Sequence, residues 1–141
     1  MELTYCPARP EDAPVIFGFA RELIETYETD PDLDLAMALS WTRRKIEKKI
    51  DEYTRVLSDK KTAAFFRFVP DGERMELDDL YVLPAFRNKG IGTAILRRCV
   101  AEGKPIYFYV FTKNTRAIAL YEREGFRKAE EVSPSRCIMI Q

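Results

Sequence analysis

The sequence predicts a mixed α/β fold in which an antiparallel run of strands leads into a strand–helix–strand crossover. Apolar residues recur at helical spacing in some segments and cluster at strand length in others. The turn Pro70-Asp71-Gly72 joins two strand-like segments as a hairpin, and farther on strands alternate with helices. We therefore expect a mixed, mostly antiparallel twisted sheet of about six to seven strands, with about four helices on both faces.

The N-terminal part is expected to hold one strand and two helices. Residues 3–6 favour a short strand, and the proline and acidic residues at the start of 10–27 open an amphipathic helix. After the acidic break 28–34, a second helix is expected over about residues 35–53. The basic cluster at 43–45 is interpreted as a solvated face of that helix.

The remaining segments are expected to complete the sheet. Strands are predicted at 55–57, 62–69, 74–82, 106–111, 126–132 and 137–140, and helices at 91–101 and 117–124. Side chains alternate between the two faces of a strand. Along the strand 74–82, this alternation predicts that Glu76 and Asp78 share one face and that Asp79 points to the other.

Length and composition indicate one domain, residues 1–141, with a sizeable core. Basic and acidic residues both number 23, so no net charge favours nucleic acid or an anionic membrane. No apolar stretch approaches the roughly 20 residues of a membrane span, and we see no signal peptide. With three scattered cysteines and no histidine, we expect a reduced, cytoplasmic protein without a metal.

The most informative run of the chain extends from residue 79 to residue 93. It reads as the end of a strand, a tight turn and the first turn of a helix. Gly90 and Gly92 leave the backbone bare where unpartnered amides and the positive end of the helix dipole attract phosphate. Arg87 and Lys89 add positive charge. The run therefore predicts a phosphorylated ligand at the carboxyl end of a strand.

Three phosphate-binding patterns compete for this run. A P-loop is excluded because no Gly-x-x-x-x-Gly-Lys-Ser/Thr string occurs. A dinucleotide fingerprint needs a third glycine, which this chain lacks after Gly90 and Gly92. That fingerprint also forms the turn after the first strand of its fold, whereas here the turn follows several predicted strands. The pattern Arg/Gln-x-x-Gly-x-Gly/Ala is matched by Arg87, Gly90 and Gly92. This match resembles the acetyl-CoA pyrophosphate loop of the GNAT superfamily of N-acetyltransferases.

A second segment resembles another signature of the same superfamily. Residues 114–126 read Asn-x-x-Ala-x-x-x-Tyr-x-x-x-Gly-Phe and follow the strand 106–111. Asn114 can cap a helix, and Gly125 suits the left-handed position that ends one. With the opening at residues 9–12, the resemblance covers essentially the whole chain and implies the GNAT fold.

The resemblance implies that acetyl-CoA is the cosubstrate and lies where the strand ending at Val82 splays from the strand 106–111. Unpaired backbone groups there would bind the pantetheine amides like an added strand, and the pyrophosphate would rest on the amides of 88–93. Asn114 would contact the pantetheine or serve as a helix cap only. The implied cofactor-binding residues are Leu80, Tyr81, Val82, Arg87, Asn88, Lys89, Gly90, Ile91, Gly92, Thr93 and Asn114.

The reaction needs an acid and a base. Tyr121 is the candidate acid, because a phenol with a pKa near 10 can protonate the leaving CoA thiolate; packing alone is the alternative. An alkylamine is deprotonated in only about one molecule in 2,500 at pH 7. Asp78 stands where spermidine/spermine N-acetyltransferases, which 77–82 partly resembles, place a glutamate, and Glu76 where other members do. Either carboxylate could act as the general base through a bound water, and Asp78 is ranked first. The alternative is that each is an ordinary solvated strand residue.

The expected function is acetyl-CoA-dependent N-acetyl transfer to a primary amine of a small molecule, amino acid or peptide, by direct attack in a ternary complex. Glu28, Asp30, Asp32 and Asp34 could attract a cationic amine, although turn and capping chemistry also explains them. A non-catalytic acyl-CoA or nucleotide sensor is the alternative. The acceptor stays open, and so does a homodimer, since dimers are common in the family.

Overall fold

The computed structural model describes residues 2–141, which form seven strands and four α-helices in the predicted order. The elements are β1 (Leu3–Pro7), α1 (Ala13–Tyr27), α2 (Leu35–Lys48), β2 (Tyr53–Ser58), β3 (Lys61–Asp71), β4 (Arg74–Val82), α3 (Ile91–Val100), β5 (Ile106–Phe111), α4 (Thr115–Arg123), β6 (Arg127–Glu131) and β7 (Arg136–Ile140). Single 3₁₀ turns occupy Pro10–Asp12, Ile50–Glu52 and Pro84–Phe86.

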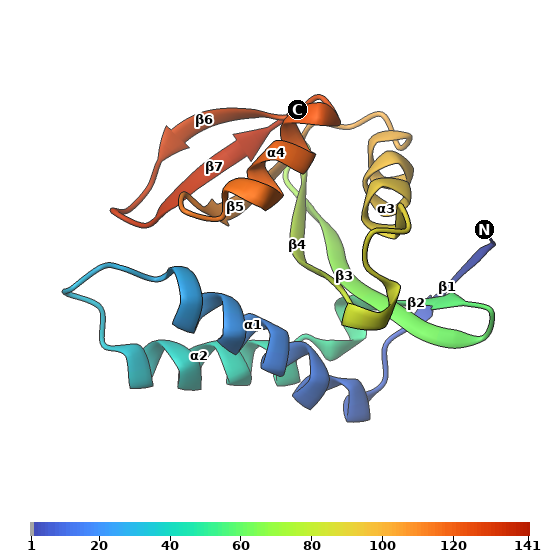
Figure 1. Ribbon diagram of the computed structural model, residues 1–141, viewed down its shortest axis with the longest axis horizontal. Helices are drawn as coiled ribbons and strands as arrows, with labels where there is room; N and C mark the ends of the chain where they lie inside the picture. Colours follow the sequence, from blue (N-terminus) through green and yellow to red (C-terminus); the bar gives the residue numbers. More distant parts are fainter. Residues whose placement is uncertain (1) are drawn as a thin grey trace.

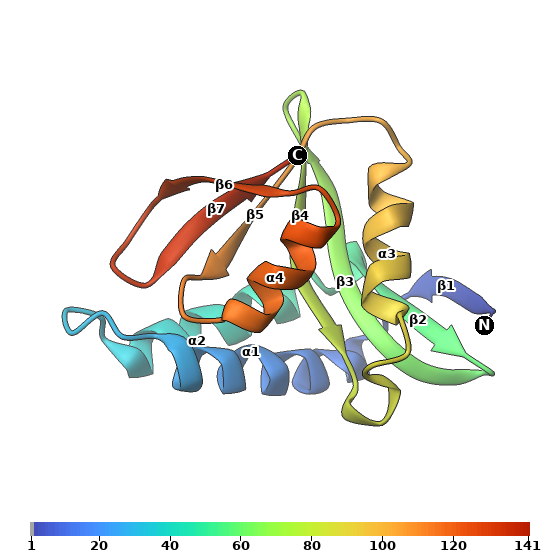
Figure 2. The ribbon, with the colours of Figure 1, turned by 45° about the horizontal axis from the view of Figure 1, so that its top comes forward.

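The strands form one sheet in the order β1-β2-β3-β4-β5-β7-β6. Only the pair β4 and β5 is parallel, because α3 carries the chain across between them. Helices α1 and α2 lie on one side of the sheet, and α3 and α4 lie on the other (Figures 1 and 2). The mixed, mostly antiparallel sheet with helices on both faces is therefore confirmed.

Each face of the sheet has its own hydrophobic cluster. On the α3/α4 side, Ile95 and Leu96 of α3 are fully buried against the strands. On the α1/α2 side, Ile16 of α1 and Ile46 of α2 meet Tyr53 and other sheet residues. Burying each large aliphatic side chain contributes about 1.5–3 kcal/mol relative to leaving it exposed. The helical spacing of apolar residues thus fixes which face of each helix meets the sheet.

The end of the second helix differs from its prediction. Helix α2 ends at Lys48, and Tyr53, predicted as its last residue, instead begins β2 opposite Arg67. The Tyr53 side chain is 1% exposed in the α1/α2-side core, and an aromatic side chain suits a buried strand position. Core burial therefore outweighs the continued helical pattern.

Strand β4 contains a bulge at Asp79. Arg67 pairs with Asp78 and Phe65 pairs with Tyr81, so one residue of β3 faces two of β4. Asp79 takes the left-handed conformation, with φ of 51°. An extra residue shifts the alternation of faces, and Asp79 contacts side chains of the α1/α2 side. The prediction that Asp79 points to the opposite face from Asp78 is therefore wrong.

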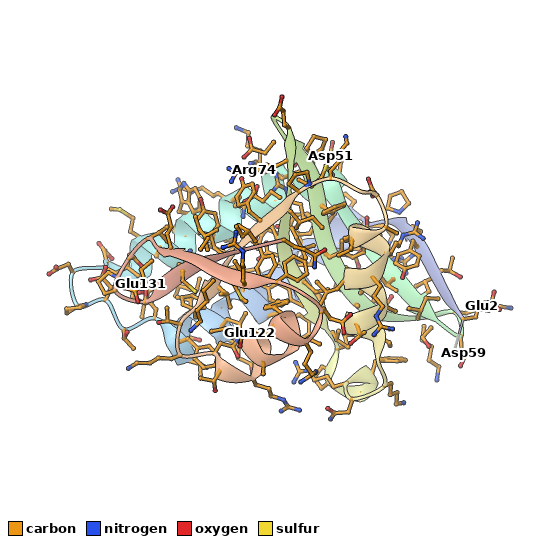
Figure 3. All side chains as sticks on the ribbon, turned by 90° about the horizontal axis from the view of Figure 1, so that it is seen from above. Glu2, Asp51, Asp59, Arg74, Glu122 and Glu131 are labelled. Atoms are coloured by element: carbon orange, nitrogen blue, oxygen red, sulfur yellow. The ribbon has the colours of Figure 1, made fainter. Side chains whose placement is uncertain are left out.

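Charged side chains are distributed around the whole molecule. Figure 3 labels Glu2 beside β1, Asp59 in the β2–β3 turn, Glu122 on α4 and Glu131 on β6, and all four are exposed. Within residues 2–141, no helix combines the length and apolar character needed to cross a membrane.

Candidate active site

The sheet opens where β4 and β5 diverge. These strands pair only at Met75 with Ile106 and at Glu76 with Tyr107, and beyond this point they separate. We call the gap beyond this last pair the β4–β5 opening; it lies between the α1/α2 side and the α3/α4 side (Figure 2). The splay predicted between these two strands is therefore confirmed.

Backbone groups of β4 face the β4–β5 opening in alternation. The Leu83 amide donates to the Ala63 carbonyl at 2.8 Å, so alternation turns the groups of Tyr81 towards β3 and those of Val82 and Leu80 towards the opening. The Val82 carbonyl accepts a hydrogen bond from Arg87 Nε at 3.0 Å. Of the three residues predicted to offer backbone groups, Leu80 and Val82 turn these groups towards the opening, whereas those of Tyr81 face β3.

The loop after β4 leads into a helix terminus with unpartnered amides. Gly90 is the N-cap of α3 with φ of 81°, a conformation that favours glycine. The Ala94 amide is bonded to the Gly90 carbonyl at 3.0 Å, so the amides of Ile91, Gly92 and Thr93 have no partner within the helix. A Cβ added at Gly92 would lie within 4 Å of Val82 and Leu120. The loop therefore packs against both the end of β4 and α4.

Three cations surround this terminus. Arg87 and Lys89, both predicted, are exposed in the loop. Arg116, in the first turn of α4, donates to Asn88 Oδ1 at 3.2 Å and adds a third charge that the sequence analysis missed. Arg116 lies two residues after Asn114, within the second motif, and this position could have indicated that it lies near the loop. Positive charge beside a helix N-terminus favours an anionic group.

Helix α4 brings two predicted residues beside the β4–β5 opening. Asn114 caps the helix by accepting the Ala117 amide at 3.3 Å. The Tyr121 ring packs on Phe108 of β5, with ring centroids 4.4 Å apart. Burial raises the pKa of Tyr121 to about 12, so the phenol stays protonated at neutral pH. Tyr121 can therefore serve as a proton donor.

On the α1/α2 side, Arg67 gathers the predicted carboxylates. Its side chain is 6% exposed and lies 2.6 Å from Glu52, 3.2 Å from Glu76 and 3.5 Å from Asp78. Lys45 of α2 donates a hydrogen bond to Asp78. Glu76 and Asp78 thus share a face as predicted, but both are ion-paired. We call these five residues the Arg67 cluster.

The interpretation of residues 43–45 as a solvated helix face is wrong for Lys45. Arg43 and Arg44 are exposed, whereas Lys45 is half-buried in the Arg67 cluster. Burial alone would lower the pKa of Lys45, but the carboxylates of Asp78 and Asp79 raise it overall. Lys45 is therefore a fixed cation of the site.

Asp79 lies next to the Arg67 cluster with different partners. Its carboxylate accepts hydrogen bonds from the Tyr53 hydroxyl at 2.5 Å and the Tyr81 hydroxyl at 2.7 Å. Burial, with the nearby charge of Asp78, raises the pKa of Asp79. Burial and the Asp79 charge also raise the pKa of both tyrosines, which therefore remain donors. The alternation rule hid this residue, because a bulge carries no strong sequence signal.

Helix α1 spans the β4–β5 opening with aromatic side chains. Phe19 stacks on Tyr81 near the end of β4, with ring centroids 5.6 Å apart. Two turns later, Tyr27 stacks on Phe111 at the end of β5, at 6.2 Å. The α1/α2 side of the opening is therefore bordered by aromatic rings.

The predicted acidic connection after α1 is largely engaged in local structure. Asp34 caps α2 by accepting the Met37 amide at 3.1 Å, and Asp30 accepts the Asp32 amide at 3.0 Å. The Glu28 side chain turns inward and accepts the Ser135 hydroxyl at 2.5 Å. Turn and capping chemistry accounts for Asp30 and Asp34, and a long-range hydrogen bond engages Glu28.

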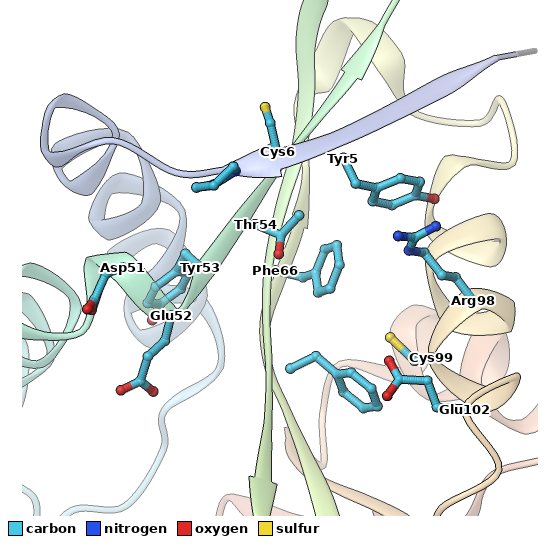
Figure 4. A pocket seen from close by; sticks show the side chains of 12 residues that line it. Tyr5, Cys6, Asp51, Glu52, Tyr53, Thr54, Phe66, Arg98, Cys99 and Glu102 are labelled. Atoms are coloured by element: carbon cyan, nitrogen blue, oxygen red, sulfur yellow. The ribbon is translucent and has the colours of Figure 1, made fainter.

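A hollow of about 390 Å³ has Glu52 of the Arg67 cluster and Tyr53 in its lining. It is lined by β1, β2, β3 and the end of α3 (Figure 4). The Arg98 guanidinium covers the Tyr5 ring at 3.9 Å, and Cys99 borders the hollow. None of the predicted site residues lines it. Among residues 2–141, no group of three or more His, Cys, Asp or Glu side chains could hold a metal ion.

Comparisons with known proteins agree on one family. Residues 18–126 match the Acetyltransferase (GNAT) family. An uncharacterized N-acetyltransferase of Methanocaldococcus jannaschii is 34% identical over 65 residues, which span 43% of this chain and 29% of that protein. The chain therefore matches less than a third of that relative.

Solved structures share the fold. The PaiA N-acetyltransferase of Thermoplasma acidophilum, in complex with coenzyme A, superposes with a TM-score of 0.72 at 19% identity, covering 100% of this chain and 99% of that one. The acetyltransferase yncA of Salmonella typhimurium, with its cofactor acetyl-CoA, gives 0.61 at 19% identity, covering 99% and 92%.

Proposed function

Because the chain belongs to the GNAT family of acetyltransferases, we propose that it transfers an acetyl group from acetyl-CoA to a primary amine by direct attack in a ternary complex. The observation that carries the proposal is the β4–β5 opening. It is flanked by a cationic helix terminus and Tyr121 on one side of the sheet, and by a group of carboxylates on the other. Cofactor and acceptor can therefore meet from opposite faces.

Acetyl-CoA binds along the loop and the open edge of β4 in this proposal. The amides of Ile91, Gly92 and Thr93 receive the pyrophosphate, together with Arg87 and Lys89; Asn88 and Arg116 complete the loop. The pantetheine amides bond to backbone groups of Leu80 and Val82. The Asn114 oxygen caps α4, which leaves its amide nitrogen to donate to the pantetheine. Solved members with coenzyme A or acetyl-CoA bound support this cosubstrate.

The chemistry requires one proton to be removed and one to be delivered. A β4 carboxylate takes the proton of the acceptor ammonium, with Asp78 and Glu76 as the candidates named by the sequence. The free amine attacks the thioester carbonyl, whose oxygen is polarised by the Val82 amide. Tyr121 protonates the leaving CoA thiolate. The acceptor is a small-molecule or peptide amine, and the aromatic border formed by α1 favours one with an apolar arm.

Isothermal titration with acetyl-CoA, CoA, ATP and NAD tests the cofactor site. We expect micromolar binding of acetyl-CoA and CoA and no comparable binding of ATP or NAD. Thiol release with a panel of polyamines, amino acids and short peptides then tests transfer. Failure to bind either CoA form contradicts the proposal. Binding without thiol release on the whole panel favours the sensor function instead.

A further inference from the structure

We propose that Asp79 is the residue that accepts the proton of the acceptor ammonium, directly or through one water, and that Tyr53 and Tyr81 hold its carboxylate in position. The inference rests on the proposed acetyl transfer and assigns its base. It replaces Asp78 and Glu76 in that role and assigns them to the ion pairs of the Arg67 cluster.

Position along β4 separates the carboxylates. Glu76 forms the last β4–β5 pair, opposite Tyr107, and so lies at the closed end of the β4–β5 opening. Asp79 lies three residues farther on, where the strands have separated, next to Leu80. The acetyl group would lie near Leu80 and Val82. Along β4, Asp79 is therefore closer to the reacting atoms than Glu76.

Charge pairing separates them further. Asp78 is bonded to Lys45 and lies 3.5 Å from Arg67, and Glu76 lies 3.2 Å from Arg67. Protonating Asp78 would leave the half-buried Lys45 without its counterion, and protonating Glu76 would remove one of the three carboxylates around the buried Arg67, so either change is costly. Asp79 forms no ion pair within 4 Å among residues 2–141, and its hydrogen bonds come from neutral phenols. It can therefore gain and lose a proton without breaking an ion pair.

The two phenols fix the Asp79 carboxylate and still leave it able to react. Tyr53 donates to Oδ2 and Tyr81 donates to Oδ1. Each carboxylate oxygen has two lone-pair positions, so each keeps one for the ammonium or a water. Tyr53 is 1% exposed in the core, and Tyr81 is stacked on Phe19. The left-handed bulge turns Asp79 to this face.

The surroundings of Asp79 set its proton affinity. Burial and the Asp78 charge favour the protonated form, whereas Lys45 of α2 and the hydroxyls of Tyr53 and Tyr81 favour the ionised form; Arg67 of β3 lies just beyond Asp78. The net result is a raised pKa. A raised pKa makes the ionised carboxylate a stronger base than an ordinary aspartate.

The proton balance is complete with the groups present. The acceptor ammonium gives one proton to Asp79, and its nitrogen attacks the thioester carbon. The C–N bond forms, the C–S bond breaks, and the CoA thiolate takes the Tyr121 proton. The nitrogen then loses its second proton to solvent, and solvent reprotonates Tyr121. Asp79 releases the proton that it accepted to solvent as the product departs.

The test is the pH profile of kcat/KM for thiol release in the wild type and in Asp79→Asn. We expect the wild type to lose activity on the acid side as Asp79 becomes protonated. Asp79→Asn should lower kcat by about 10²–10⁴-fold, the usual range for a general base, and lose this acidic limb. Its affinity for acetyl-CoA should match the wild type, which shows that the fold and cofactor site are intact.

Matched variants separate a base from a structural residue. Asp78→Asn and Glu76→Gln should retain the acidic limb and lose less than about tenfold in kcat. Tyr53→Phe and Tyr81→Phe should move the limb to higher pH, because each hydroxyl stabilises the ionised carboxylate. A purely structural Asp79 predicts no such movement.

The outcomes distinguish the two proposals. If the wild type turns over and Asp79→Asn keeps both its rate and its acidic limb, the assignment of Asp79 is wrong while acetyl transfer stands. The same holds if Asp78→Asn alone removes the limb. If the wild type binds acetyl-CoA but acetylates no amine, acetyl transfer itself fails and the base assignment falls with it. Loss of the limb in Asp79→Asn alone, with the shifts in the tyrosine variants, supports the proposal.

Discussion

Glu28 at the end of α1 and Ser135 before β7 are 107 residues apart in the chain, yet the Ser135 hydroxyl donates to the Glu28 carboxylate at 2.5 Å. Arg136 lies 3.8 Å from the same carboxylate. Only 7% of the Glu28 side chain is exposed. This contact joins the end of α1 to the segment that leads into β7 and so ties the α1/α2 side to the β5–β7 part of the sheet.

Glu28→Ala should destabilise the protein. The substitution leaves the buried Ser135 hydroxyl with only the longer contact to Ser133 Oγ at 3.4 Å, and loss of the shorter bond costs about 1–3 kcal/mol of unfolding free energy. Urea denaturation measures the change. Glu25→Ala on the same helix is the control, because the Glu25 side chain is 53% exposed and should cost about 0.5 kcal/mol or less. Equal losses in both variants would show that the Glu28–Ser135 contact contributes nothing of its own.

Gly90→Glu should weaken acetyl-CoA binding by about 100-fold or more, because a carboxylate would stand at the proposed pyrophosphate site and like charges cost several kcal/mol. Gly72→Glu is a matched control. Gly72 also has positive φ, and an added Cβ meets nothing within 4 Å at either glycine, but Gly72 lies in the β3–β4 hairpin. Calorimetry showing equal affinity for the two variants would contradict the assigned phosphate site.

Tyr121→Phe should lower kcat about 100-fold through loss of the acid, with acetyl-CoA affinity unchanged. The control Tyr109→Phe alters a tyrosine that is 50% exposed and should have no effect. Because the pKa of Tyr121 is raised to about 12, its ionisation should not reduce wild-type activity between pH 8 and 10. An alkaline loss near pH 9 that disappears in Tyr121→Phe would contradict this environment.

Arg67→Met should be severely destabilising. It removes the cation shared by Glu52, Glu76 and Asp78, and breaking one side of a buried ion pair typically costs about 3–5 kcal/mol. The same change at Arg43, which pairs on the surface with Glu47, should cost about 1 kcal/mol or less. Thermal and chemical denaturation give the comparison. A loss at Arg67 as small as that at Arg43 would mean that the Arg67 cluster is well hydrated.

Asp79→Asn should stabilise the protein at pH 7. The pKa of Asp79 is raised on folding, so its favourable contribution is present below the unfolded value near 4 and is lost as pH rises through the folded value. An uncharged asparagine avoids that loss. The gain should vanish below about pH 4, where aspartate is protonated in both states. Denaturation curves at pH 4 and pH 7 that show the same difference would contradict the raised pKa.

Much of the fold followed from local patterns. The apolar stripe of α1 and the Gly90 and Gly125 breaks marked elements that the structure confirms, since helix ends and turns depend on nearby residues. The cofactor loop was equally local, because its amides, glycines and cations lie within one short run. Two motifs in sequence order were enough to suggest the family.

The acceptor side was predicted less well, because it joins residues far apart in the chain. Lys45, Arg67 and Asp78 come from three elements, and no periodicity shows that they meet. Arg116 joins the phosphate loop only because α4 packs beside α3.

The sequence by itself determined the order of elements, the crossover after β4 and the glycine turn at Gly90, because each depends on residue spacing over a few positions. Only the tertiary structure decided which β4 carboxylate is outside the ion pairs of the Arg67 cluster. The bulge at Asp79 reverses the expected alternation, packing against α2 engages Asp78 with Lys45, and Tyr53 and Tyr81 converge on Asp79 from different strands. These contacts join residues that are far apart in the chain, and they depend on how the helices pack against the faces of the sheet.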